Sequence, residues 1–278
     1  MTGYILRVEC DDAKGLIFKI TRILFEHGLS IVVNGEFVDG KRSRFFLRAE
    51  LEGDCDIESV SNQLHEVLPA EAAVEMDVSR TKDIVVFATR EAHCLGDLLL
   101  RHESKEFDAR IGAVISNRLD LGDLVERFGI PFYCVSHDDL EQDAQEAQVL
   151  EVMERYACDY LVMAKYMRIL SESFVDRFAG RIVNIHHSFL PAFVGANPYG
   201  QAFQRGVKVI GATAHFVTVD LDEGPIIAQD VFPIDHTHSA SDMAQAGRDV
   251  EKTVLARALK LVFEDRVFIS GNRTIIFD

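Results

Sequence analysis

Five short, almost uninterrupted apolar runs in the second part of the chain restrict its fold more than any other feature. Strands that are buried on both faces have this pattern, and such strands are typical of parallel sheets covered by helices. Segments with a helical spacing of apolar residues separate the runs, which predicts an open, mostly parallel, doubly wound α/β sheet. The runs are DIVVFAT, ARIGAVIS, PFYCV, DYLVMA and RIVNI.

The first 80 residues follow a different pattern, because apolar and polar residues alternate along their strands. This alternation predicts strands at 4–10, 30–38, 44–51 and in AAVEMDV, with a helix after the first strand and another after the third. The order βαββαβ is that of a ferredoxin-like unit. The polar stretch SRTK separates the two patterns, so we predict one domain over residues 1–80 and another over 83–278.

Composition excludes several classes of function. The formal net charge of -16 disfavours binding to the phosphate backbone of nucleic acids. We find no signal-peptide pattern and no apolar run long enough to span a bilayer, so we expect a cytoplasmic protein without a membrane partner. The 5 Cys residues are scattered and lack C-x-x-C spacing, which argues against a disulfide framework and a zinc cage.

Polar side chains with catalytic chemistry follow two of the apolar runs. Asn184, His186 and His187 come at the end of RIVNI, and ligands of open α/β sheets bind beyond the carboxyl ends of the strands. The run VKVIGATAHFV contains His215, and Asp222 follows seven residues later, so two strand ends would bring imidazole and carboxylate together. Such a set suits attack on a carbonyl, with an amide for the oxyanion, a His for proton transfer and an Asp to orient or activate water.

Two other interpretations of these residues are open. Each could be a structural side chain, and the four groups His186, His187, His215 and Asp222 could ligate a metal. Adjacent strand residues point to opposite faces, so His186 and His187 are not expected to share one ion. The segment ATREAHCLGDLL has no G-x-G-x-x-G and no P-loop, which gives no reason to expect a nucleotide. We therefore expect no metal and no cofactor.

Three segments, NIHHSFLPAF, GATAHFVTVDLDEGPII and AKYMRIL, resemble the folate-dependent formyltransferase family. Within that family, HHSFLPAF resembles the branch that hydrolyses 10-formyltetrahydrofolate to formate and tetrahydrofolate. The resemblance covers nearly the whole chain, and it implies a formyltransferase-type fold for residues 83–278 with the folate as substrate.

The resemblance also implies roles for single residues. Asn184, His186 and Asp222 would be catalytic. To these we add His187 and His215 as candidate auxiliary residues, which the resemblance does not assign. The folate would contact a pocket whose residues are Met167, Arg168, Ile169, Leu170, Val217, Thr218, Asp220 and Leu221, with Met163, Val175 and Ile182 as apolar walls.

The first 80 residues resemble ACT domains, which pair with one another and bind amino acids at the junction. The resemblance implies a homo-oligomer with an effector site at Asp12 and Gly15 in the turn DDAKG, and glycine or methionine as candidate effectors. Lys14 stands where ACT domains often have Pro, so a domain that serves only to hold subunits together is the alternative.

Two rival functions differ from hydrolysis in their acceptor. A glycinamide ribotide formyltransferase needs a Gly- or Ser-rich loop for its phosphate, whereas this chain has TREAHCLGDLL with Glu91. A tRNA formyltransferase needs a basic surface, which the charge of the chain disfavours. A noncatalytic amino-acid sensor is the third alternative, and it has no need for Asn184, His186 and Asp222 together.

Overall fold

The structure is a computed structural model that describes residues 2–138, 140–192 and 198–278. The chain divides into two compact units, Met1–Arg80 with Phe277–Asp278, and Thr81–Ile276. The division lies within the polar stretch SRTK, and each unit has a hydrophobic core of its own. None of the described helices is both long and apolar enough to cross a membrane.

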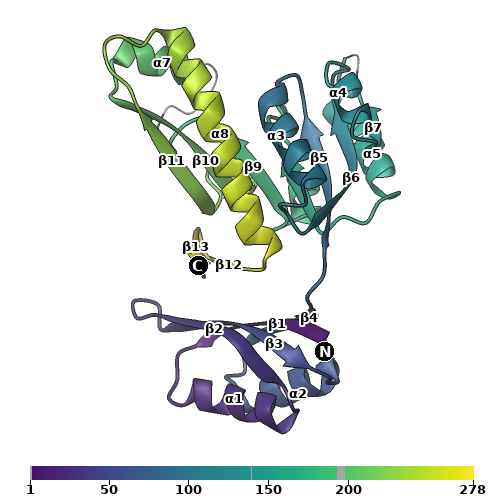
Figure 1. Cartoon of the computed structure of the whole chain (residues 1–278), viewed down its shortest axis with the longest axis vertical. Helices are drawn as coiled ribbons and strands as arrows, with labels where there is room; N and C mark the ends of the chain where they lie inside the picture. The colour runs from purple at the N-terminus through teal and green to yellow at the C-terminus, as the bar shows by residue number, and fades with distance from the viewer. Residues whose placement is uncertain (1, 139, 193–197) are drawn as a thin grey trace. The chain divides into compact units, whose positions relative to one another are not determined.

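The first unit has the predicted ferredoxin-like topology (Figure 1). Its antiparallel sheet has the strand order β2-β3-β1-β4. Alternate residues of β1, including Leu6 and Val8, are fully buried and share a core with Ile20 of α1 and Leu64 of α2. The elements are β1 (Thr2–Asp11), α1 (Leu16–Glu26), β2 (Ser30–Asp39), β3 (Arg44–Gly53), α2 (Ile57–Val67) and β4 (Ala73–Val78).

The second unit is a mostly parallel α/β sheet with the order β11-β10-β9-β8-β5-β6-β7, as the apolar runs predict. Within this order, the neighbouring strands β9, β8, β5, β6 and β7 are parallel to one another. Its strands and helices are β5 (Lys82–Ala88), α3 (Ala92–Glu103), β6 (Ala109–Ser116), α4 (Gly122–Glu126), β7 (Phe132–Cys134), α5 (Gln142–Met153), β8 (Tyr160–Met163), α6 (Glu172–Arg177), β9 (Ile182–His186), α7 (Pro198–Arg205), β10 (Val209–Phe216), β11 (Ile226–Pro233), α8 (Ala240–Phe263), β12 (Val267–Ser270) and β13 (Arg273–Ile276).

Helices cover both faces of this sheet, which makes it doubly wound. Ile84 and Val86 of β5 belong to the core that includes residues of α3 and α8. Val85 and Phe87, the alternate residues, belong to the core that includes residues of α5 and α6. Because both faces of β5 are buried, the strand reads as an unbroken apolar run. In Figure 1, α8 lies along the part of the sheet that contains β9 and β10.

The direction of β10 differs from the sequence-based expectation that two strand ends meet at one edge. Strand β10 runs antiparallel to β9, and His215 pairs directly opposite Asn184. The loop after β10 then turns back, and the Phe216 N–H donates to the Pro225 carbonyl at 2.9 Å. The imidazole of His215 and the carboxylate of Asp222 therefore reach the end of β9 through strand pairing and a return loop, and not through two parallel strand ends.

Candidate active site

A cavity of about 300 Å³ lies where β8 and β9 end. Its lining includes Asn184, His186, His187, His215 and Asp222, so the structure brings all five predicted polar residues together. The rest of the wall is largely apolar and comes from the segment after β8 and the loop after β10. An apolar cavity with a few converging polar groups is the usual form of a small-molecule site.

Most of the predicted folate residues also line this cavity: Met163, Met167, Arg168, Ile169, Leu170, Val175, Val217, Thr218 and Leu221. Two predicted residues lie elsewhere. Ile182 is fully buried in the core beside α5 and α6. Asp220 is exposed, and its main-chain carbonyl accepts a hydrogen bond from the Thr218 hydroxyl at 3.2 Å.

A hydrogen bond to His215 orients the amide of Asn184. His215 Nδ1 lies 2.9 Å from the Phe216 carbonyl, which can only accept, so Nδ1 carries the proton. Burial lowers the pKa of His215, and its neutral ring therefore presents Nε2 as an acceptor to Asn184 Nδ2 at 3.3 Å. An amide has two N–H donors. Among the residues that the structure describes, the second N–H of Asn184 has no partner. It is thus available to a ligand.

His186 and Asp222 form a buried acid-base pair. His186 Nδ1 lies 3.2 Å from Asp222 Oδ1, and His215 Nε2 lies 3.8 Å from the same oxygen. Burial acts to raise the pKa of Asp222, but the hydrogen bond with His186, and the charge of His186 when it is protonated, outweigh it and lower that pKa. Asp222 is therefore a carboxylate at neutral pH. His186 Nε2 is buried without a hydrogen-bond partner in the described part of the chain, which leaves it for substrate.

Gly224 holds the turn that carries Asp222. A Cβ added at Gly224 would lie 1.8 Å from the Phe216 carbonyl oxygen, so no other residue allows this return of the chain. Asp222 itself has φ +57°, a left-handed conformation that non-glycine residues adopt rarely and that is concentrated at functional sites. The motif DLDEGP thus reads as a turn built to place one carboxylate beside His186.

His187 lies on the same side as His186, which contradicts the expected alternation. The two rings stack with their centroids 5.1 Å apart and 22° between their planes. The strand ends at His186, so the alternation of a β-strand no longer holds at the next residue. Burial, together with the positive charges of Lys165 and of His186 when it is protonated, lowers the pKa of His187 to about 4. The ring is therefore neutral near pH 7.

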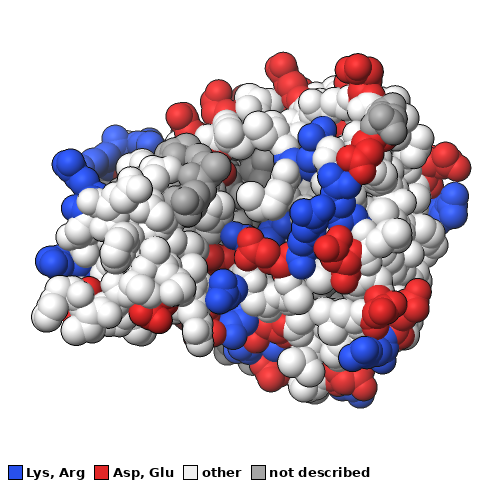
Figure 2. Space-filling model, turned by 90° about the horizontal axis from the view of Figure 1, so that it is seen from above, with Lys and Arg blue, Asp and Glu red and all other residues white. Residues whose placement is uncertain are grey.

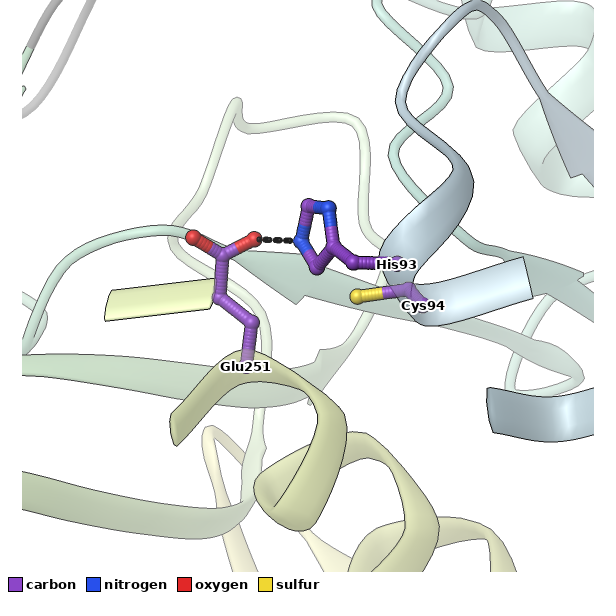
Figure 3. A group of neighbouring side chains, drawn as sticks. All are labelled: His93, Cys94 and Glu251. Carbon is purple, nitrogen blue, oxygen red and sulfur yellow. Dashed lines mark hydrogen bonds and ion pairs between the residues drawn. The ribbon is translucent and has the colours of Figure 1, made fainter. Parts of the chain in front are cut away.

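The structure also contains a buried polar cluster that sequence reasoning missed. Glu251 of α8 is 1% exposed and lies against His93 at the start of α3. Figure 3 shows His93 and Glu251 facing each other, with Cys94 beside them. The ligand atoms of these three residues lie within 4.8 Å of one another, a spacing that could suit a metal ion.

The donor atoms of this cluster are committed to other partners. Glu251 Oε2 lies 2.8 Å from His93 Nε2 and 3.2 Å from Lys165 Nζ, so an ammonium already neutralises the carboxylate. Burial, and next the charge of Glu251, raises the pKa of the Cys94 thiol, so the sulfur keeps its proton. Because the carboxylate is already paired with an ammonium and an imidazole, the cluster is described best as a salt-bridged network.

The fold and the polar groups at the end of β9 define a folate-type formyl transferase domain, and residues 82–259 match the formyl transferase family. A formyltetrahydrofolate deformylase of Escherichia coli O6:H1 is 53% identical, over 98% of this chain and 97% of its own length. A deformylase of Bacillus subtilis strain 168 is 43% identical, over 98% and 93%. This chain belongs to the formyltetrahydrofolate deformylases.

Solved structures agree with this assignment. The crystal structure of a formyltetrahydrofolate deformylase from Pseudomonas syringae pv. tomato has a TM-score of 0.96 and 40% identity, and the match covers 100% of this chain and 95% of that one. A glycinamide ribonucleotide transformylase from Symbiobacterium toebii has a TM-score of 0.68 and 31% identity, and the match covers 71% and 95%. The deformylase match thus extends over the whole chain, whereas the transformylase match covers part of it.

Proposed function

We propose that this chain hydrolyses 10-formyltetrahydrofolate to formate and tetrahydrofolate. The deformylases to which it is similar carry this activity in their name, and their similarity spans both units. The observation that carries the proposal is the set of Asn184, His186 and Asp222 at the wall of one largely apolar cavity. The flat apolar rings of a folate suit such a wall, and released formate and tetrahydrofolate return to the one-carbon pool.

In the first step, water adds to the formyl carbon. A C–O bond forms, the C=O electrons move to the oxygen, and the N–H of Asn184 stabilises the resulting oxyanion. His186 Nε2 accepts a proton from the water, while the Asp222 carboxylate stabilises the imidazolium through Nδ1. His186 then donates this proton to N10 as the C–N bond breaks. Formic acid loses the second proton of the water to solvent and leaves as formate.

The product distribution tests this proposal against the transferase alternative. Purified protein with 10-formyltetrahydrofolate should release formate and tetrahydrofolate in equal amounts, and added phosphoribosyl glycinamide should leave that ratio unchanged. The physical reason is the segment around Glu91, which is exposed and would repel a phosphate. Formylated ribotide as the main product would identify a transferase.

Over the face shown in Figure 2, basic and acidic side chains are interspersed, whereas nucleic-acid binding favours clustered cations.

The first unit, in this proposal, is an ACT-type domain through which subunits pair. Its topology fits, and β2 is an edge strand that exposes Ile31, Val33 and Phe37 by more than a third of their surface. Phe18 and Phe25 on α1 are 68% and 81% exposed. Exposed apolar edge strands are templates for pairing with another chain. A second copy of this unit would cover them and give a homo-oligomer.

The effector site is proposed at the turn that contains Asp12 and Gly15. Gly15 has φ +82°, and an added Cβ would meet no heavy atom within 4 Å in the described structure. Its backbone conformation, and not crowding within the described part of the chain, therefore requires glycine. Gly15 precedes α1, and neither an acidic side chain in the first turn nor a side-chain cap satisfies the N–H groups there. Such N–H groups favour a carboxylate.

Gly15→Val should remove any response of the hydrolysis rate to glycine or methionine while leaving the basal rate within about twofold. Gly28→Val is the matched control, because Gly28 has φ +71°, lies in the same unit and also has no atom within 4 Å of an added Cβ. Both variants carry the same backbone strain of roughly 1 kcal/mol or more. Rates with and without each amino acid are the measurement. If neither the rate nor the Tm of the wild type changes with any amino acid, regulation is refuted and the pairing role remains.

A further inference from the structure

A second cavity, of about 480 Å³, adjoins the first one. Lys165, Met167 and His187 line both cavities, so the two meet at these residues. The second cavity continues to His93, Tyr199 and the side of α8. It is thus a second space beside His187, from which an acceptor of the formyl group would reach the site.

Glu251 lies behind the wall of this second cavity, where its carboxylate contacts three of the lining residues. Oε1 accepts a hydrogen bond from the Tyr199 hydroxyl at 2.6 Å. Oε2 lies 2.8 Å from His93 Nε2 and 3.2 Å from Lys165 Nζ. Burial acts to raise the pKa of Glu251, but these three partners outweigh it and lower the pKa to about 2. A charged, fully paired carboxylate of this kind is unavailable to an incoming ligand.

Tyr199 reaches Glu251 because α8 has a glycine one turn earlier. A Cβ added at Gly247 would lie 2.1 Å from the Tyr199 hydroxyl oxygen and 2.2 Å from its ring carbon Cζ. The ring therefore lies against the helix backbone at Gly247. The close approach of α7 to α8 thus places the hydroxyl on Glu251, which shows that the network is fitted into the packing.

Lys165 is the cation of the network, and its backbone is strained to put it there. It has φ +64°, which few non-glycine residues adopt, and it is 4% exposed. Buried Lys residues without a partner are rare, and here Glu251 is the partner. The strain and the burial together hold one ammonium group at the junction of the two cavities, beside His187.

We propose that Lys165, held by Glu251, is a specificity-determining residue that reserves the acceptor side of the site for water. Its ammonium occupies the position at Glu251 that the ammonium of an amine acceptor would otherwise take. Because its charge is neutralised, Glu251 does not attract a second cation into this space, whereas neutral water needs no such attraction. This inference rests on the proposed hydrolysis and deepens it, because it names what prevents formyl transfer to an amine.

Removing the charge should open the second cavity to amines. In Lys165→Met, Glu251 keeps Tyr199 and His93 as partners but loses its ammonium, so its charge attracts the ammonium of glycinamide, used as the probe. The amine, after losing a proton to solvent, forms an N–C bond with the formyl carbon, the C–N10 bond breaks, and N10 takes the second amine proton. We expect the ratio of formylglycinamide to formate to rise roughly tenfold or more, since a carboxylate without its ammonium attracts a cation. Chromatographic product analysis measures the ratio.

Two further variants make the test specific. Lys165→Gln loses the charge but keeps a donor for Glu251, so it folds more readily and should show the same change in products. Lys82→Met is the matched control, because Lys82 Nζ is 2.7 Å from Asp265 Oδ2 in another partly buried ion pair of the same unit. Lys82→Met should lose stability and keep the product ratio of the wild type.

The native enzyme gives an independent readout, because glycinamide should neither accept the formyl group nor slow formate release. Inhibition of the native enzyme by glycinamide would overturn the inference, as would a native product ratio in both Lys165 variants. A wild type that releases no formate would instead refute the proposed hydrolysis itself. The two failures are therefore distinguishable.

Discussion

Asn184→Ala is expected to lower kcat for formate release by roughly 100- to 1000-fold, which is the usual cost of losing one oxyanion donor. The amide of Asn184 is held by His215 at 3.3 Å, so its donor is oriented before substrate binds. The oxyanion exists in the transition state and not in the bound substrate, and the loss should therefore appear in kcat. The Kd for a folate analogue should change by less than about threefold. Stopped formate assays and fluorescence titration measure the two quantities.

Asn117→Ala provides the control for general damage. Asn117 Nδ2 lies 3.3 Å from His137 Nδ1, so the same kind of Asn-His hydrogen bond is removed from the same unit. Asn117 is buried and does not line the cavity with Asn184. This variant should lose stability and retain most of its kcat. Equal losses of kcat in both variants would show that Asn184 acts through the fold and not on the oxyanion.

Asp222→Asn is expected to lower kcat by roughly 100- to 10,000-fold, the range for general acid-base groups. Asparagine tolerates the left-handed backbone at φ +57°, so the turn should persist while the negative charge beside His186 disappears. Without that charge, the imidazolium that forms on His186 loses its stabilising partner at 3.2 Å. The folding cost should be small, because the substitution preserves the shape of the side chain.

Asp265→Asn is the matched control for this substitution. Asp265 also has a positive φ, +53°, and it also forms an ion pair, in which its Oδ2 lies 2.7 Å from Lys82 Nζ. The control should therefore reproduce the effects on backbone and charge at a site without catalysis. Both variants should show similar Tm values and very different rates. Retention of more than about a tenth of the kcat by Asp222→Asn would contradict the role given to this carboxylate.

The architecture could be predicted because burial leaves a direct mark on sequence. Ile84 through Ala88 pack on both faces of the sheet, and so the run is continuously apolar. The alternation along β1 likewise reflects one buried face and one partly exposed face. The direction of β10 could not be predicted, because an apolar run has the same composition in either orientation. The expected orientation of His187 was wrong for a related reason, since the alternation of side chains ends where β9 ends.

The Glu251 network lay beyond sequence reasoning because it depends on contacts between distant segments. His93, Lys165, Tyr199 and Glu251 come from α3, the segment after β8, α7 and α8. One signal was present: Glu251 follows Val250 and precedes Val254 by three residues, which places a carboxylate on the buried stripe of α8. A buried acid requires a cation, but the helical pattern does not say which residue supplies it.

Hydrolysis in ¹⁸O-labelled water tests most directly whether water is the acceptor of the formyl group. The formyl oxygen stays in the product and the second formate oxygen comes from the attacking water, so mass spectrometry should find formate with one ¹⁸O atom. The labelled formate should appear at the rate at which tetrahydrofolate forms, with glycinamide present or absent. Formate without the label, or tetrahydrofolate formed without formate, would contradict attack by water at this site.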